Sequence, residues 1–68
     1  MTFEMFDHVR IKKNGLIGQI VDIINSKSGP EYTVESDVKG ERDDADMPSE
    51  WPLYFCKQNE IESVKHPA

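Results

Sequence analysis

Residues 9–23 read VRIKKNGLIGQIVDI, and this stretch decides the fold class. Apolar and polar side chains alternate up to a central Asn-Gly dipeptide, which favours a two-residue type I′ turn, and the alternation resumes after it. The pattern predicts a β-hairpin. With a two-residue turn, Ile11 lies opposite Gly18. Val9 then lies opposite Ile20, and the apolar side chains share the core face of the sheet.

The remainder of the chain extends this hairpin into an all-β architecture. Four apolar residues between 20 and 24 cannot all face inward with a period of two, which predicts a β-bulge near Val21 or Asp22. In the third strand, Tyr32 and Val34 are expected to point into the core. We expect strands over residues 8–13, 17–24, 31–36, 51–56 and 61–64, a loop over 25–30 and one helical turn over 58–60.

Residues 37–50, DVKGERDDADMPSE, contain no apolar repeat and predict one long, mobile acidic loop. The fold class expected is therefore all-β, a small five-stranded barrel with this loop as its one long insertion. The 68 residues form a single domain, 1–68, with its core at about 6–64.

Size and charge exclude several classes of function. A chain of 68 residues has too little bulk to enclose a deep cleft, so we predict a protein that is not an enzyme. The net charge is −5, and residues 31–68 carry ten Asp/Glu against four Lys/Arg, which disfavours nucleic acid as a partner. One cysteine allows no internal disulfide. With no secretory signal and no long apolar run, we expect a cytoplasmic protein without membrane contact, a monomer or weak dimer.

Residues 7–11 (DHVRI) and 15–23 (GLIGQIVDI) resemble the SH3-like barrel domains of the KOW-type variant. In that family a strand of valine, basic and hydrophobic residues is followed by a return strand anchored by glycine. The resemblance covers roughly residues 6–64 in architecture, but only the first hairpin carries a motif. It implies a five-stranded SH3-like barrel that binds RNA or a partner protein. RNA-binding members are usually basic, whereas the second half of this chain is acidic.

The leading candidate site is a surface for another protein. In SH3-type barrels, exposed aromatic rings beside acidic loops bind peptides. Trp51 follows the acidic loop, and the sequence leaves open whether it is a core or a surface residue. The function expected is a non-enzymatic interaction module, and one concrete form of it neutralises a basic partner. The residues predicted to contact the partner are Trp51, Tyr54, Asp43, Asp44 and Asp46.

The alternative function is that of a KOW-like RNA-binding accessory domain. Its phosphate contacts would come from Arg10, Lys12, Lys13 and Lys27. The same cations also have a purely structural explanation. On the outward face of a strand, they keep the surface hydrated and prevent the strand from pairing with another chain.

No metal, cofactor or catalytic residue is predicted. The acidic loop lacks the glycine and the flanking helices of an EF-hand. His8, His66 and Cys56 have no zinc-ligand spacing. Cys56 is interpreted as a strand residue, because no orienting partner for a nucleophile accompanies it.

Overall fold

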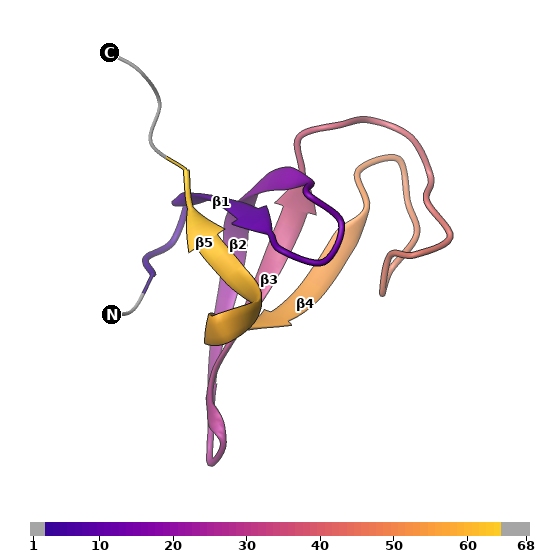
Figure 1. Cartoon of the computed structure of the whole chain (residues 1–68). Coiled ribbons are helices and arrows are strands. Elements are labelled where there is room, and N and C mark those ends of the chain that lie inside the picture. Colours follow the sequence, from indigo (N-terminus) through magenta and orange to yellow (C-terminus); the bar gives the residue numbers. More distant parts are fainter. Residues whose placement is uncertain (1–2, 65–68) are drawn as a thin grey trace.

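Five antiparallel strands and one short 3₁₀ turn make up almost all of the regular structure. The computed structural model describes residues 3–64 and is drawn in Figure 1. The elements are β1 (His8–Ile11), β2 (Ile17–Ser26), β3 (Gly29–Ser36), β4 (Leu53–Lys57), η1 (Gln58–Glu60) and β5 (Ile61–Ser63). The strands form one sheet in the order β4-β3-β2-β1-β5. The all-β class, the five strands and the helical turn are confirmed. The sheet is curved but open, with β4 and β5 as its edges, so the five predicted strands are present but do not close into a barrel.

The first hairpin has a longer connection than predicted. Val9 pairs with Gly18 rather than with Ile20, and five residues, 12–16, join β1 to β2. The Ile11 N–H donates to the Leu16 carbonyl at 2.8 Å, which closes this connection. A shift of two residues preserves which face each side chain occupies, so the predicted core residues still point inward.

The β1–β2 connection makes hydrogen bonds both within itself and to a part of the chain that is distant in the sequence. The Lys12 N–H donates to the carbonyl of Glu60 in η1 at 3.0 Å. The Asn14 side chain accepts the Leu16 N–H at 3.0 Å, as Asn does in an Asx turn. Gly15 adopts a positive φ of 74°. Asn14 and Gly15 therefore shape the turn as part of a five-residue connection.

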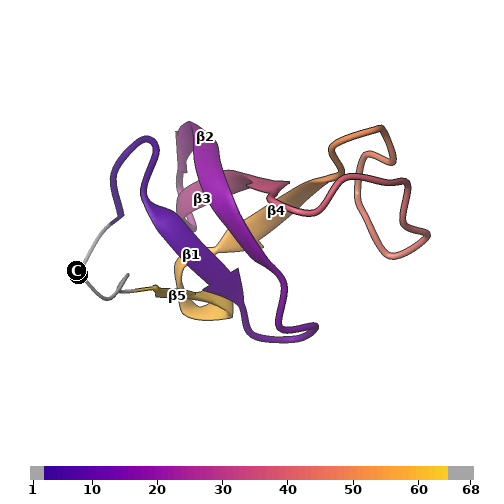
Figure 2. The same cartoon turned by 90° about the horizontal axis from the view of Figure 1, so that it is seen from above.

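The second hairpin is longer than predicted and contains the bulge. The register between β2 and β3 shifts between Ile20 and Asp22, which confirms the bulge expected there. Beyond it, pairing continues to Ser26 and Gly29, so the predicted loop over 25–30 contracts to a tight turn at 27–28. Gly29 supplies the positive φ of 113° that this turn uses. The end of this hairpin projects beyond the sheet (Figure 1), and the view from above shows the segment between β3 and β4 extending to one side of it (Figure 2).

The core fills the concave side of the curved sheet. Phe3 packs edge-on against the Tyr32 ring, with the two centroids 5.5 Å apart, and its N–H donates to the Tyr32 hydroxyl. The inward orientation of Tyr32 and Val34 is confirmed. The buried apolar residues are Val9, Ile11, Ile20, Tyr32, Val34, Tyr54, Cys56 and Ile61. Within residues 3–64, no helix has the length and apolar character needed to cross a membrane.

Gly18 is required because β2 and β3 approach closely at this residue. A Cβ added at residue 18 would lie 2.4 Å from the Glu35 carbonyl oxygen and 2.7 Å from Val34 Cγ1. The first of these atoms belongs to the backbone and cannot move aside without disturbing the ladder. The structure therefore explains why residue 18 is a glycine: any side chain at this residue would push β2 and β3 apart.

We predict that Gly18→Ala lowers the free energy of unfolding by about 2 kcal/mol or more, because overpacking against a backbone atom cannot relax locally. Urea denaturation measures the change. Gly15→Asn is the matched control: nothing lies within 4 Å of a Cβ at residue 15, and Asn tolerates a positive φ. A Gly18→Ala protein as stable as the control would contradict the close approach.

Candidate functional site

The acidic loop, residues 37–50, folds back along the free edge of β4. Met47 and Leu53 exchange two backbone hydrogen bonds of 3.1 and 3.2 Å. The Asp46 carboxylate accepts the Phe55 N–H at 2.8 Å. Further along β4, the Lys57 N–H donates to the Glu60 carboxylate of η1 at 2.7 Å. The loop and η1 together provide hydrogen-bond acceptors for the outward N–H groups of β4. Without these acceptors, the N–H groups of an edge strand can pair with another chain.

Asp44 connects three parts of the chain that are distant in sequence. Its Oδ1 accepts the Tyr54 hydroxyl at 2.8 Å and Arg42 Nε at 3.0 Å. Its Oδ2 accepts the Asn14 amide of the β1–β2 connection at 3.2 Å. The hydrogen bond from Arg42, followed by that from Tyr54, lowers the pKa of the Asp44 carboxyl from 3.8 to about 2. The charged carboxylate therefore anchors the middle of the acidic loop.

Tyr54 and the three aspartates predicted to contact a partner have different environments. Tyr54 is fully buried, so the expectation that its ring belongs to an exposed binding surface is wrong. Burial, followed by the contact with Asp44, raises the pKa of its hydroxyl. Asp44 and Asp46 are exposed, but their oxygens are engaged in holding the loop. Asp43 is exposed and makes no hydrogen bond or ion pair within the described part of the chain.

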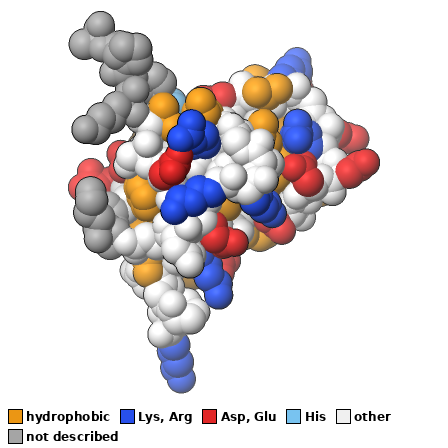
Figure 3. Space-filling model, viewed as in Figure 1, with side chains coloured by type: hydrophobic (Ala, Val, Ile, Leu, Met, Phe, Trp, Pro, Cys, Tyr) orange, Lys and Arg blue, Asp and Glu red, His pale blue; other side chains and the backbone are white. Residues whose placement is uncertain are grey.

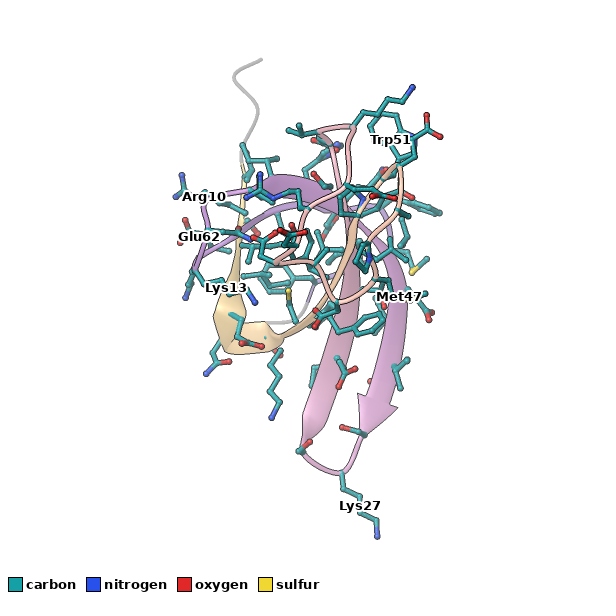
Figure 4. The ribbon with its side chains drawn as sticks, turned by 90° about the vertical axis from the view of Figure 1, so that its right-hand side faces the viewer. Arg10, Lys13, Lys27, Met47, Trp51 and Glu62 are labelled. Carbon is teal, nitrogen blue, oxygen red and sulfur yellow. The ribbon has the colours of Figure 1, made fainter. Side chains whose placement is uncertain are left out.

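Trp51 is a surface residue, which answers the question that the sequence left open. Its side chain is 42% exposed and lies where the acidic loop enters β4. The next residue, Pro52, is buried and holds the backbone at that point. Two further apolar side chains of the loop are exposed, Val38 at 55% and Met47 at 51%. Figure 4 shows Trp51 and Met47 on the same side of the molecule.

The surface of the acidic loop is negative. Residues 37–50 contain six Asp/Glu and two Lys/Arg. Both cations are in ion pairs, Lys39 with Glu50 at 2.6 Å and Arg42 with Asp44. Acidic side chains gather at the outer end of the loop (Figure 3). The combination is an exposed tryptophan directly after a loop in which acidic residues outnumber basic ones by four.

The four cations of the predicted nucleic-acid site do not form one patch. Arg10 faces Glu62 across the β1–β5 ladder, and its Nε donates to the Glu62 carboxylate at 2.7 Å. Lys27 lies at the tip of the β2–β3 hairpin, far from Arg10 and Lys13 (Figure 4). Lys12 and Lys13, neighbours in the β1–β2 connection, are the two that the structure keeps together.

A groove that the sequence did not predict lies between the β1–β2 connection, β4 and η1. Its volume is about 320 Å³. It occupies the gap that the open sheet leaves beside the edge strand β4. The lining residues are Ile11, Lys12, Lys13, Phe55, Cys56, Asn59 and Glu60.

Cys56 lies at the base of this groove and is buried. Burial and the negative charge of Glu60 raise the pKa of its thiol from 9.0 to about 11. The thiol is therefore protonated at neutral pH and is a poor nucleophile. Within residues 3–64, no group of three His, Cys, Asp or Glu side chains is arranged to hold a metal ion. His66 lies outside the described residues.

One sequence signal could have indicated the groove. Phe55 occupies an outward position of β4, between the buried Tyr54 and Cys56, where strand alternation favours a polar residue. The rest of the lining carries no motif. Comparisons with protein-family models, with curated proteins and with solved structures gave no match.

The acid stability of the protein tests the Asp44 anchor. Because its pKa is lower in the folded state, Asp44 stabilises the fold fully above about pH 4, and this contribution is lost as the pH falls toward 2. We therefore predict that Asp44→Asn is less stable than the parent protein at pH 5, and that the difference shrinks at pH 2. Urea midpoints measured across this range, with Asp43→Asn as the control, check it. A difference independent of pH would contradict the anchor.

The reactivity of Cys56 tests the raised thiol pKa. We predict that iodoacetamide alkylates the native protein at pH 8 roughly a hundredfold more slowly than the urea-unfolded chain, because a thiol of pKa about 11 is almost entirely protonated there. Mass spectrometry of timed samples gives both rates. Equal rates would show that the thiol is neither buried nor shifted.

Proposed function

We propose that this protein is a non-enzymatic, cytoplasmic interaction module that binds a basic partner protein through the outer surface of its acidic loop. The observation that carries the proposal is Trp51, an exposed tryptophan on a segment whose two cations are both neutralised by their own ion pairs. Tryptophan is among the residues that contribute most to binding at protein interfaces. Exposed apolar side chains on a strongly charged surface favour a partner with the opposite charge.

The anchoring of the loop supports this assignment. Hydrogen bonds at Asp44, Asp46 and Met47 attach the loop to β4, so that ordering it on binding costs little conformational entropy. Asp43 is left free to face a partner. Asp44 and Asp46 contribute negative potential while they hold the surface in shape. The Tyr54 ring is buried in the core, and its hydroxyl group holds the loop by donating a hydrogen bond to Asp44.

RNA binding is supported less well by the geometry. Of the four candidate cations, Arg10 is paired with Glu62 and Lys27 lies at a distant hairpin tip. The remaining pair, Lys12 and Lys13, gives few phosphate contacts on a protein of net charge −5. The resemblance to SH3-like barrels of the KOW type stays part of the proposal. It draws support from the strand order β4-β3-β2-β1-β5 and the 3₁₀ turn before β5.

The test is an affinity capture from source-cell lysate after nuclease treatment, with three immobilised proteins. The parent chain is compared with Trp51→Ala and with Phe6→Ala, a control that removes another exposed aromatic ring far along the chain. We expect a basic protein on the parent and on the control, and a loss of about 30-fold in affinity for Trp51→Ala, as for a central interface residue. Asp43→Lys should weaken the same complex, more so at low salt.

Thermal unfolding of each variant shows that the fold is intact before the comparison is made. Binding that survives Trp51→Ala and Asp43→Lys unchanged would contradict the proposed surface. Recovery of nucleic acid from untreated lysate, lost on Lys12→Glu and Lys13→Glu, would instead support the RNA-binding alternative.

A further inference from the structure

The groove beside β4 has the composition of a small-ligand site. Ile11 and Cys56 form its floor and are almost fully buried, while Phe55, 44% exposed, forms an aromatic side. The groove is distinct in character from the acidic surface around Trp51. Its volume of about 320 Å³ is at the lower end of the range for ligand pockets, enough for one ring and a short chain.

The charged side chains around the groove differ in whether they already have a partner. The carboxylates of Glu60 and Asp46 accept the backbone N–H groups of Lys57 and Phe55, at 2.7 and 2.8 Å, and so face the edge of β4. In contrast, Lys12 and Lys13 form no ion pair within residues 3–64. Figure 4 shows Lys13 beside the ribbon of β5 and η1.

We propose that this groove binds a small carboxylic acid with an apolar or aromatic body. The body of the ligand packs on Ile11 and Cys56 against the Phe55 ring, and its carboxylate pairs with the ammonium groups of Lys12 and Lys13. A cationic ligand is disfavoured, because the lining carries two ammonium groups and one carboxylate, that of Glu60, and so has a net positive charge. A neutral ligand gains the apolar contact alone. The Asn59 side chain lies at the same rim and can donate a further hydrogen bond to a carboxylate.

The experiment is a two-dimensional NMR titration of the whole chain with three probes that share one ring. These are 3-phenylpropionate, the neutral 3-phenylpropan-1-ol and the cationic 3-phenylpropylamine. For ligands of this size we expect dissociation constants on the order of 1 mM, which NMR measures well. The acid should shift the signals of Ile11, Phe55 and Cys56, and should bind at least about threefold more tightly than the alcohol. The amine should bind most weakly.

Charge variants separate the lysines from the apolar contact. Lys12→Gln and Lys13→Gln should each weaken binding of the acid by about two- to fivefold, the range of a partly exposed ion pair, and leave the alcohol unchanged. Lys27→Gln, which removes a cation at the hairpin tip, is the matched control and should change nothing. Glu60→Gln keeps an oxygen for the Lys57 N–H and removes a negative charge, so it should tighten binding of the acid.

The source of the carboxylate is tested with N-acetyl-Gly-Gly-Phe. Tighter binding than 3-phenylpropionate assigns the site to the end of a peptide chain, and equal or weaker binding assigns it to a free small acid. Two results would overturn the proposal. One is the same affinity for acid, alcohol and amine, and the other is a set of shifted signals that lies away from Ile11 and Cys56.

Discussion

The hydrogen bond from the Tyr54 hydroxyl to the Asp44 carboxylate is the contact on which the arrangement of the functional surfaces depends. It joins a buried core ring to the middle of a long loop that contains no strand or helix of its own. The same carboxylate engages Arg42 within the loop and Asn14 in the first hairpin connection. One ionised group thereby fixes the acidic loop relative to both β4 and the β1–β2 connection.

This arrangement separates two roles that acidic residues have in the loop. Asp44 and Asp46 hold the loop against the edge of β4, where backbone donors would otherwise be unpaired. Asp43 and the exposed Trp51 are the residues proposed to contact a partner. A loop of this composition can serve as a binding surface because some of its charges are used for structure. The carboxylates that shape the surface also add to its negative potential.

The parts of the fold that depend on local patterning were predictable. The alternation around Val9 and Ile20 identifies the core face, and the excess of apolar residues at 20–24 indicates the bulge. The length of the turn at Asn14 was not predictable, because the predicted and observed registers differ by two residues and place the same side chains on the core face. The open sheet is likewise a tertiary outcome. The alternation of apolar and polar residues within the strands does not show whether the edge strands β4 and β5 pair with each other.

The candidate site was predictable only in part, for the same reason. The acidic loop and Trp51 are visible in the sequence, but the burial of Tyr54 and the engagement of Asp44 appear only when the chain is folded. The central claim is that this loop is an ordered surface. ¹⁵N relaxation of the backbone amides of residues 44–47 tests it most directly. We expect order parameters near those of the strands, about 0.8 or higher, and lower values in Asp44→Asn. Values below about 0.6 in the parent protein would contradict it.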